Sequence, residues 1–323
     1  MNNTTKRRSR YKRDSNPVKG RYQHPGDTEI IKLVHEYKYL TRPLLELLTG
    51  RKDRSIKRRL RFLFDHQYLA KVQFTRSYQE TGSTPDVYVL DTKGRAAYGE
   101  HTGLAPDYHR TQLEKRNRDP QLEHTLLINT VRALVTAACE RLDDVELCLW
   151  KREGKDTRDR VKLTDGKSWP IAPDAFFILR VNDRLQAFFL EADCSTMDMN
   201  RMKKKYQAYY NYYQIIRADI KRQKRQKQGK IKLSNRFNVP SFRALTVVAD
   251  SAGGRDGEER RLASLMQTVL KVNEQGRGWG GFWFAPASRM SLDIPESLLI
   301  EQVWQIGFQN GEMTLRDTHS LLE

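Results

Sequence analysis

Acidic residues at the ends of two apolar strands are the part of this sequence best suited to chemistry. Residues 168–193 predict two strands joined by a tight turn, with Asp174 in the first and Glu191 and Asp193 at the end of the second. Pairing of these strands would bring the acids together. Converging carboxylates resist burial unless a cation accompanies them. A hard divalent ion that takes oxygen ligands and keeps several waters, such as Mg²⁺ (or Mn²⁺), meets that requirement.

A basic, tyrosine-rich helix is predicted directly after the second strand. It carries Lys203, Lys204, Lys205, Tyr206, Tyr209, Tyr210, Tyr212 and Tyr213. We expect Tyr206, Tyr213 and one of Tyr209 and Tyr210 to pack against the sheet. The outward tyrosines would stack on bases or sugars beside the lysines, and Lys203, Lys204 and Tyr209 are the DNA-binding candidates. A tyrosine nucleophile is the alternative, but the seven histidines are scattered without an H-x-H pair, so the usual metal-holding cluster is missing from the sequence.

Positive charge is concentrated in two segments. The chain has a formal net charge of +18, residues 1–22 hold eight Lys or Arg against one acid, and residues 201–232 hold twelve against one. The rest of the chain is therefore neutral overall. This distribution is typical of a phosphate-binding protein, because neutralising phosphates releases counterions. A solubilising surface is the alternative reading.

The N-terminal part predicts three short helices followed by two strands. Such an order is typical of a winged helix-turn-helix, in which the third helix enters the major groove of duplex DNA. The predicted third helix buries one apolar face and exposes a basic face, which carries Arg54, Lys57, Arg58 and Arg61 as DNA-binding candidates. A winged helix that mediates protein contacts, or a basic helix that is only solvated, are the alternatives.

The predicted fold has two domains, an N-terminal winged helix-turn-helix and an α/β domain with a central mixed sheet. We expect these segments: a disordered basic arm (1–25), the winged helix (26–101), a linker (102–120), the α/β domain (121–290) and a helical tail (291–323). Within the α/β domain, residues 151–167 are expected to form a charged loop. The three cysteines, Cys139, Cys148 and Cys194, have no paired spacing and are expected to be reduced. The sequence has no apolar stretch long enough for a membrane span, so we expect a cytoplasmic protein.

The order of elements and motifs resembles a known family. The acids on the second and third strands of the α/β domain resemble the PD-(D/E)xK restriction-endonuclease-like superfamily. The combination of a winged helix with PDAFF, FFLEADCST and KKKYQAYYNYY is similar, more closely, to the replication-relaxation family of plasmids and other mobile elements. The resemblance covers the chain from Thr28 to about Pro286.

The resemblance assigns roles to particular residues. It implies that Asp174 and Glu191 bind metal, with the Ala192 carbonyl completing the protein side of the site. The lysine of the motif would fall at position 193, where this chain has Asp193. This further acid is a catalytic candidate together with Asp174 and Glu191. Lys205 on the following helix is the implied replacement. Glu123, on the first helix of the domain, resembles an additional acid that some members use as a metal ligand.

Two functions follow as hypotheses. The first is a Mg-dependent DNA endonuclease or nickase, relaxase-like, that acts in replication initiation or mobilisation of a mobile element. The second is a non-catalytic DNA-binding initiator or transcriptional regulator in which the nuclease-like domain is degenerate. Asp193 favours the second, whereas the presence of both Asp174 and Glu191 favours the first. The expected partner is double-stranded DNA, with single-stranded DNA, a second copy of the chain and the replication or conjugation machinery as further candidates.

Overall fold

The chain divides into two compact units, Met1–Asn129 and Thr130–Glu323, in the computed structural model. The division lies within a helix, α6, and differs from the predicted linker 102–120, most of which lies outside the described residues. The structure describes residues 9–17, 25–51, 53–72, 85–104, 121–163, 166–226, 237–249, 254–273, 279–301, 303–306 and 318–322. The two units are described separately below.

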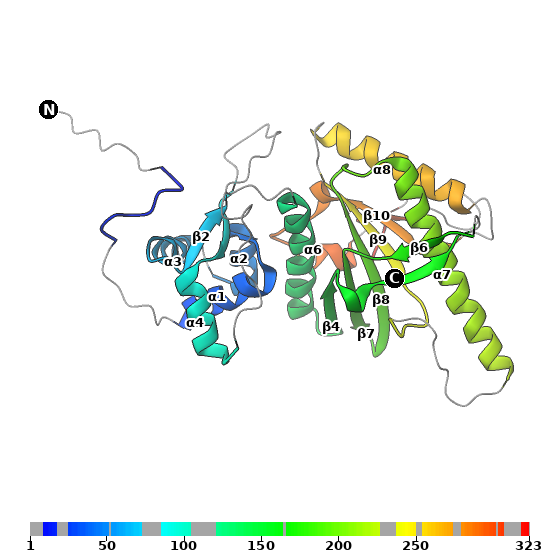
Figure 1. Ribbon diagram of the computed structural model, residues 1–323, viewed down its shortest axis with the longest axis horizontal. Coiled ribbons are helices and arrows are strands. Elements are labelled where there is room, and N and C mark those ends of the chain that lie inside the picture. Colours follow the sequence, from blue (N-terminus) through cyan, green and yellow to red (C-terminus); the bar gives the residue numbers. More distant parts are fainter. Residues whose placement is uncertain are drawn as a thin grey trace. The chain divides into compact units, whose positions relative to one another are not determined.

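The N-terminal unit contains helices on either side of a small sheet (Figure 1). Its elements are α1 (Pro25–Tyr37), β1 (Leu40–Thr41), α2 (Arg42–Thr49), α3 (Asp53–Asp65), β2 (Leu69–Val72), β3 (Val87–Leu90) and α4 (Thr92–Thr102). The strands pair antiparallel in the order β1-β3-β2. Helix α4 was not predicted, although Asp91 caps it by accepting a hydrogen bond from the Thr92 amide at 2.8 Å.

Part of the basic N-terminal arm lies against this unit. In residues 9–17, Arg10 forms an ion pair with Asp86 at 2.6 Å, and Arg13 forms one with Asp91. The sequence predicted a disordered arm, and the described part differs because its arginines meet acids at both ends of β3. These two guanidinium groups are therefore engaged within the protein.

The C-terminal unit is an α/β structure with a mixed sheet, as the sequence predicted. Its helices and strands are α6 (Leu122–Arg141, shared with the first unit), β4 (Val145–Arg152), η1 (Lys155–Thr157), β5 (Asp159–Lys162), β6 (Ser168–Ile171), β7 (Ala175–Val181), β8 (Arg184–Asp193), α7 (Met199–Arg225), β9 (Arg243–Val248), α8 (Gly254–Asn273), β10 (Phe282–Pro286), η2 (Ala287–Arg289), α9 (Ser297–Ile300), β11 (Trp304–Ile306) and β12 (Thr318–His319). The seven-stranded sheet has the order β12-β11-β10-β9-β8-β7-β4. Strands β8, β9 and β10 are parallel, and the other neighbours pair antiparallel.

The turn between β7 and β8 fixes the register on which the acidic site depends. Asn182 and Asp183 have φ of 45° and 65°, the left-handed conformation that a two-residue hairpin of this kind requires and that Asn and Asp tolerate. The register then runs from Val181 opposite Arg184 to Ala175 opposite Leu190. A slip of one residue would move every side chain to the other face of the sheet.

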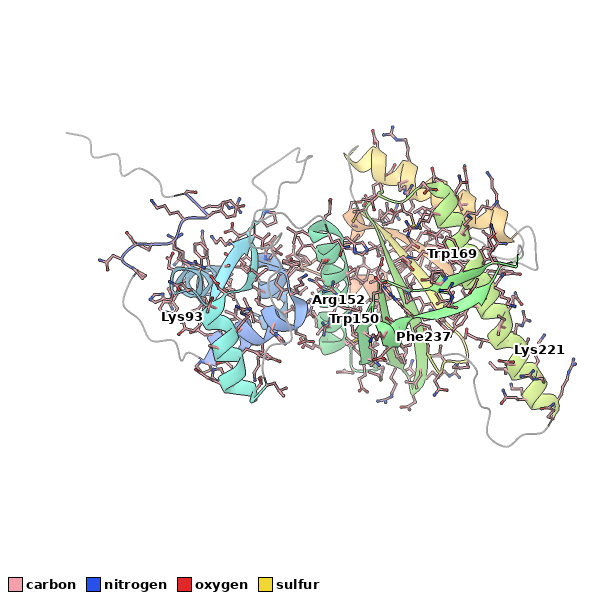
Figure 2. The ribbon with its side chains drawn as sticks, in the orientation of Figure 1. Lys93, Trp150, Arg152, Trp169, Lys221 and Phe237 are labelled. Atoms are coloured by element: carbon pink, nitrogen blue, oxygen red, sulfur yellow. The ribbon has the colours of Figure 1, made fainter. Side chains whose placement is uncertain are left out.

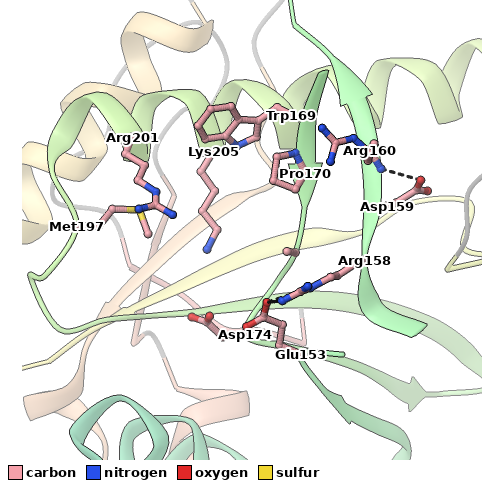
Figure 3. Close-up of a pocket in the computed structure, with 11 residues that line it drawn as sticks. Glu153, Arg158, Asp159, Arg160, Trp169, Pro170, Asp174, Met197, Arg201 and Lys205 are labelled. Carbon is pink, nitrogen blue, oxygen red and sulfur yellow. Dashed lines mark hydrogen bonds and ion pairs between the residues drawn. The ribbon is translucent and has the colours of Figure 1, made fainter. Parts of the chain in front are cut away.

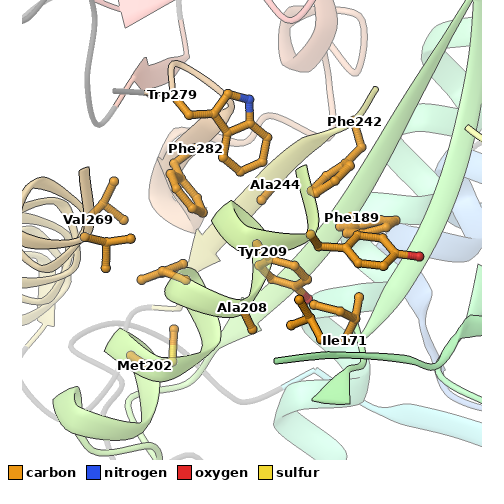
Figure 4. Close-up of a cluster of buried hydrophobic side chains, with 14 of the residues drawn as sticks. Ile171, Phe189, Met202, Ala208, Tyr209, Phe242, Ala244, Val269, Trp279 and Phe282 are labelled. Carbon is orange, nitrogen blue, oxygen red and sulfur yellow. The ribbon is translucent and has the colours of Figure 1, made fainter. Parts of the chain in front are cut away.

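Helices α7 and α8 cover one face of this sheet and bury an aromatic core (Figures 1 and 4). Phe189 of β8 lies at its centre, with ring centroids 4.2 Å from Phe242 and 5.6 Å from Tyr209. On the opposite face, the guanidinium of Arg132 in α6 lies 6.0 Å from the centre of the Trp150 ring. Burial on both faces explains why β8 has an almost continuous apolar sequence.

The C-terminal segment differs from the predicted helical tail. Of the described part of residues 291–323, only the short α9 is α-helical, and β11 and β12 extend the sheet beyond β10. Trp304 is buried in β11 and donates a hydrogen bond from Nε1 to the Leu298 carbonyl at 2.9 Å. The segment returns to the sheet because its apolar side chains can be buried there. Strands of only two or three residues leave too short a pattern in the sequence to be predicted.

A second hairpin was also missed. Residues 151–167 were interpreted as a charged loop, but β5 and β6 pair antiparallel within and beyond that segment. Val161 and Ile171 are buried against α7, while the side chains of Arg160 and Lys162 are exposed. The alternating pattern was present, but the high charge of the segment obscured it.

Candidate active site

Asp174 and Glu191 are neighbours at one end of the β7–β8 hairpin. Continuing the register by one residue beyond Ala175 and Leu190 places the two acids opposite each other, on the same face of the sheet. The Asp174 amide donates to the Leu190 carbonyl at 3.0 Å, and the Ala192 amide donates to the Asp174 carboxylate at 2.8 Å. The hairpin thus brings together the two acids that the sequence singled out.

Glu191 is buried and both its carboxylate oxygens accept hydrogen bonds. Only 2% of its surface is exposed. Lys205 Nζ donates to Oε2, and Tyr209 Oη donates to Oε1. Lys205 and Tyr209 are one turn apart on α7, so both reach Glu191 from the same side of the helix. The structure therefore brings Lys205, the predicted replacement lysine, to the acidic pair.

The environment of this cluster shifts its titration. Burial raises the pKa of Glu191 to about 8; the Lys205 ammonium opposes this shift and the Asp174 charge adds to it. Burial acts to lower the pKa of Lys205, but the Glu191 and Asp174 carboxylates outweigh burial and raise it. Burial, followed by the Glu191 charge, raises the pKa of Tyr209 well above its ordinary value. Burial thus favours the neutral form of Glu191, and it keeps Tyr209 protonated as a hydrogen-bond donor.

Asp174 and Lys205 line an open pocket with a volume of about 640 Å³. Figure 3 shows both side chains directed into it, with Trp169 and Arg160 on the β5–β6 side and Glu153 beside Asp174. Glu153 follows β4, and its amide donates to the Asp174 carbonyl at 3.0 Å. The pocket gives solvent and ligands access to Asp174, while Glu191 lies behind it.

Asp193 has a different environment from the one expected for a catalytic residue. It is buried, and Arg261 of α8 donates to both carboxylate oxygens at 2.8 and 3.3 Å. Arg261 also donates to the Met197 carbonyl at 2.7 Å. The Asp193–Arg261 pair thus fixes the β8–α7 connection. The assignment of Asp193 to catalysis is corrected accordingly, because its oxygens face α8 and not the Asp174 pocket.

Tyr209 was predicted to bind DNA, and this assignment is corrected as well. Its side chain is 1% exposed, its ring packs in the aromatic core (Figure 4), and its hydroxyl is bonded to Glu191. Tyr206 and Tyr212 are also buried, whereas Tyr210 and Tyr213 are half-buried. The sequence predicted that Tyr206, Tyr213 and one of Tyr209 and Tyr210 pack against the sheet. The fully buried tyrosines are instead Tyr206, Tyr209 and Tyr212. A buried Tyr209 cannot stack on a base in this conformation.

The remaining predicted residues of α7 lie at the surface near the pocket. Lys204 is exposed, with Nζ 5.6 Å from the centre of the Trp169 ring, and Lys203 is half-buried. Further along the helix, the basic residues of the last turns lie away from the sheet, as Lys221 does in Figure 2. These positions agree with a cationic surface beside the pocket.

The predicted recognition face of α3 is exposed. Arg54, Lys57, Arg58 and Arg61 all lie on its solvent side, and Arg61 also forms an ion pair with Asp65 at 2.7 Å. The opposite face is buried. The predicted positions of the basic, exposed face and the apolar, buried face of α3 are therefore confirmed.

The donor atoms can be tested against a divalent ion. The part of the chain that the structure describes has no group of three or more His, Cys, Asp or Glu side chains arranged to hold a metal. Mg²⁺, however, is often bound by one or two carboxylates, with waters and substrate phosphates supplying the other ligands. Asp174 and Glu191 fit such a partial site once Lys205 releases Glu191. Glu123 lies in the first turn of α6, in the N-terminal unit, and its role as a third ligand stays a prediction.

Sequence reasoning missed several residues at the site. They are Glu153, Arg158, Arg160, Trp169 and Arg261. The first four belong to the segment interpreted as a loop or to the strand that pairs with it. Alternation of buried and exposed residues from 159 to 163 was the available signal for them, whereas no local pattern could pair Arg261 with Asp193, 68 positions away.

The C-terminal unit is thus a mixed-sheet α/β structure in which two acids of paired strands meet a lysine of the following helix. The sequence model of the replication-relaxation family matches residues 31–227, and the chain belongs to that family. This match confirms the predicted family and links the protein to replication and mobile elements.

Further comparisons gave less. Neither the curated proteins nor the solved structures include a significant match to this chain. Within the described residues, none of the helices is long and apolar enough to cross a membrane.

Proposed function

We propose that this protein binds DNA of a plasmid or other mobile element and nicks it in a metal-dependent reaction during replication initiation or mobilisation. The observation that carries the proposal is the meeting of Asp174, Glu191 and Lys205 beside an open pocket. Family membership supports the biological setting. The proposal needs DNA, a Mg²⁺ or Mn²⁺ ion and water at this pocket.

Each residue has a role in such a reaction. Asp174 faces the pocket and would hold the ion, together with Glu191. The ion would supply acidification of a water and stabilisation of charge on the scissile phosphate. Lys205 would turn from Glu191 toward the phosphate and stabilise its developing negative charge, a role suited to a compact ammonium. Tyr209 would keep its hydrogen bond to Glu191 and so hold that carboxylate in one orientation.

The N-terminal unit supplies a means of finding duplex DNA. The helices α1, α2 and α3, the antiparallel sheet of β1, β3 and β2, and the basic exposed face of α3 support a winged helix-turn-helix assignment. In that reading Arg54, Lys57, Arg58 and Arg61 contact the DNA site. The side of α7 that carries the half-buried Lys203 and the exposed Lys204 would contact the DNA backbone near the cleaved strand.

A nicking assay tests the proposal. Supercoiled plasmid carrying the cognate origin is incubated with protein and Mg²⁺ or Mn²⁺, and nicked circles are quantified. We expect nicking by the wild type that depends on the ion and falls at least about 100-fold in Asp174→Asn and Lys205→Met. Asp183→Asn, at the far end of the hairpin, is the matched control and should nick normally. Wild-type protein that gives no nicked circle, or Asp174→Asn that nicks normally, would contradict the proposal.

A non-catalytic initiator or regulator is the second candidate. It is favoured by one observation: position 193, where the motif has lysine, carries an acid that Arg261 neutralises. In that case the pocket would serve binding alone. DNA binding at the origin without any ion-dependent nicking would favour this candidate.

A further inference from the structure

The β5–β6 hairpin forms one side of the pocket that contains Asp174. It is fixed to α7 at two points: Tyr212 Oη donates to the Asp159 carboxylate at 2.5 Å, and Asn211 Nδ2 donates to the Lys162 carbonyl at 3.1 Å. The buried side chains of Val161 and Ile171 join the same core as α7. The strands β5 and β6 therefore form a wall of the site that is packed against α7.

This wall presents cations to the pocket. Arg158 and Arg160 come from the hairpin side, and Arg201 comes from the first turn of α7 (Figure 3). Arg160 is oriented by its hydrogen bonds to the Ser168 hydroxyl and carbonyl at 2.9 and 3.2 Å. Arg158 is held by Glu153 at 2.5 Å. A guanidinium presents five donors in a planar fork, which suits it to contact a phosphate in addition to its neighbours in the protein.

Trp169 adds an aromatic surface between these cations. Its indole lines the pocket and is half-buried, and Lys204 Nζ lies 5.6 Å from the ring centre on α7. Figure 3 draws the ring among the side chains that line the pocket, which include Lys205. Arginines next to an aromatic ring are the combination with which proteins hold the phosphates and stack the bases of single strands.

The combination of arginines with the Trp169 ring would favour a single strand over a duplex. A base within a duplex has both faces covered by its neighbours, so an indole can stack only on a base that is unpaired. The volume of about 640 Å³ lies in the range of pockets that enclose small organic ligands, between roughly 300 and 1,000 Å³. It can take a nucleotide, but a double helix cannot enter it.

We propose that this pocket is a single-strand binding site in which Trp169 stacks on an unpaired base while Arg158, Arg160 and Arg201 hold the adjoining phosphates. The proposal rests on the proposed function and makes it more specific: the strand that reaches Asp174 is unpaired, whereas the N-terminal unit binds the duplex. Melting or extrusion of the strand would then precede cleavage.

Binding measurements without metal test this inference. The fluorescence anisotropy of a labelled single strand of about 12 nucleotides, and of the duplex of the same sequence, is titrated with full-length protein in EDTA. Trp169→Ala should weaken single-strand binding about tenfold, which corresponds to loss of one stacked base, and leave duplex binding unchanged. Trp169→Phe should keep the affinity within about threefold, because it keeps a stacking ring.

A second variant covers the case in which Trp169→Ala fails to fold. Arg160→Ala should weaken single-strand binding by about fivefold or more, through loss of a phosphate contact. Arg184→Ala, an exposed arginine at the other end of β8, is the matched control and should bind as the wild type does. Unchanged single-strand affinity in Trp169→Ala or Arg160→Ala, or an equal loss in Trp169→Ala and Trp169→Phe, would overturn the inference.

The outcome is separate from that of the nicking assay. A protein that never nicks but needs Trp169 for single strands retains the inference and loses the proposed reaction. A protein that nicks through Asp174 but binds single strands without Trp169 retains the proposed reaction and loses the inference.

Discussion

At the scale of single residues, Glu191 is a buried carboxyl whose surroundings disfavour its charged form. A carboxyl that is 2% exposed is costly to ionise, and Lys205 and Tyr209 offset only part of that cost. Its pKa is therefore raised, to about 8. A bound divalent ion would favour the charged form instead, so this group should respond to both pH and metal.

The raised pKa of Glu191 predicts a pH dependence of stability. Because the folded pKa of about 8 lies above that of the unfolded chain, the stabilisation is fully present below pH 4 to 5. It is lost as pH rises through about 8. Urea unfolding in EDTA at a series of pH values, for wild type and Glu191→Gln, measures this contribution. The wild-type advantage should shrink across that window, and parallel curves would contradict the assignment.

The hydroxyl of Tyr209 should matter for stability and not for DNA contact. Tyr209→Phe removes a donor from a buried carboxylate and should lower the free energy of unfolding by about 1–3 kcal/mol. Tyr210→Phe, on the half-buried side of the same helix, should change it by less than about 0.5 kcal/mol. Denaturant unfolding measures both. A Tyr209→Phe protein of normal stability but weakened DNA affinity would restore the original surface assignment.

At the scale of elements, the sequence predicted those features that a local pattern of apolar and polar residues determines. The apolar strands with a polar Asn182–Asp183 turn predicted the hairpin, and the hairpin register then brought Asp174 to Glu191. The amphipathic pattern of α3 likewise predicted its basic face. What failed depended on distant partners: the burial of Tyr209, the pairing of Asp193 with Arg261, and the return of the C-terminal segment to the sheet.

The Asp193–Arg261 pair joins the β8–α7 connection to α8. Both side chains are largely buried, at 4% and 14% exposed, so removal of one leaves an uncompensated charge. Arg261→Met should therefore cost about 3–5 kcal/mol, and Asp193→Asn combined with it should recover part of that loss. Arg260→Met, an exposed neighbour, is the control. Thermal or urea unfolding provides the test, and a double variant no more stable than Arg261→Met would argue against a direct pair.

The exposed face of α3 should determine which duplex is bound. Replacing Arg54, Arg58 and Arg61 with alanine should reduce the preference for the cognate site more than the affinity for unrelated duplex, since base contacts specify and phosphate contacts position. Competition binding with cognate and unrelated duplexes measures the ratio. Loss of general affinity with an unchanged ratio would mean that another element reads the DNA.

At the scale of the whole molecule, the charge distribution predicts how DNA binding should depend on salt. The net charge of +18 resides in the arm and in the α7 region, although Arg10 and Arg13 of the arm are engaged by acids of the protein itself. The phosphate contacts are therefore expected chiefly from α3, α7 and the β5–β6 hairpin. Their number governs the salt dependence.

DNA affinity should fall steeply with salt. About six phosphate contacts correspond to a loss of roughly 1,000-fold in affinity between about 50 and 200 mM salt. Binding isotherms of the full chain at a series of salt concentrations give the slope of log K against log salt. A flat plot would remove the electrostatic basis of the account.

Uptake of a divalent ion tests the central claim most directly. Titration of Mn²⁺ into the protein bound to uncleaved DNA, followed by electron paramagnetic resonance, counts the bound ions. We predict about one ion or two per chain for the wild type and for Asp183→Asn, and loss of that binding in Asp174→Asn. No bound ion in the wild type, or the same uptake in Asp174→Asn, would show that the paired acids are not a metal site.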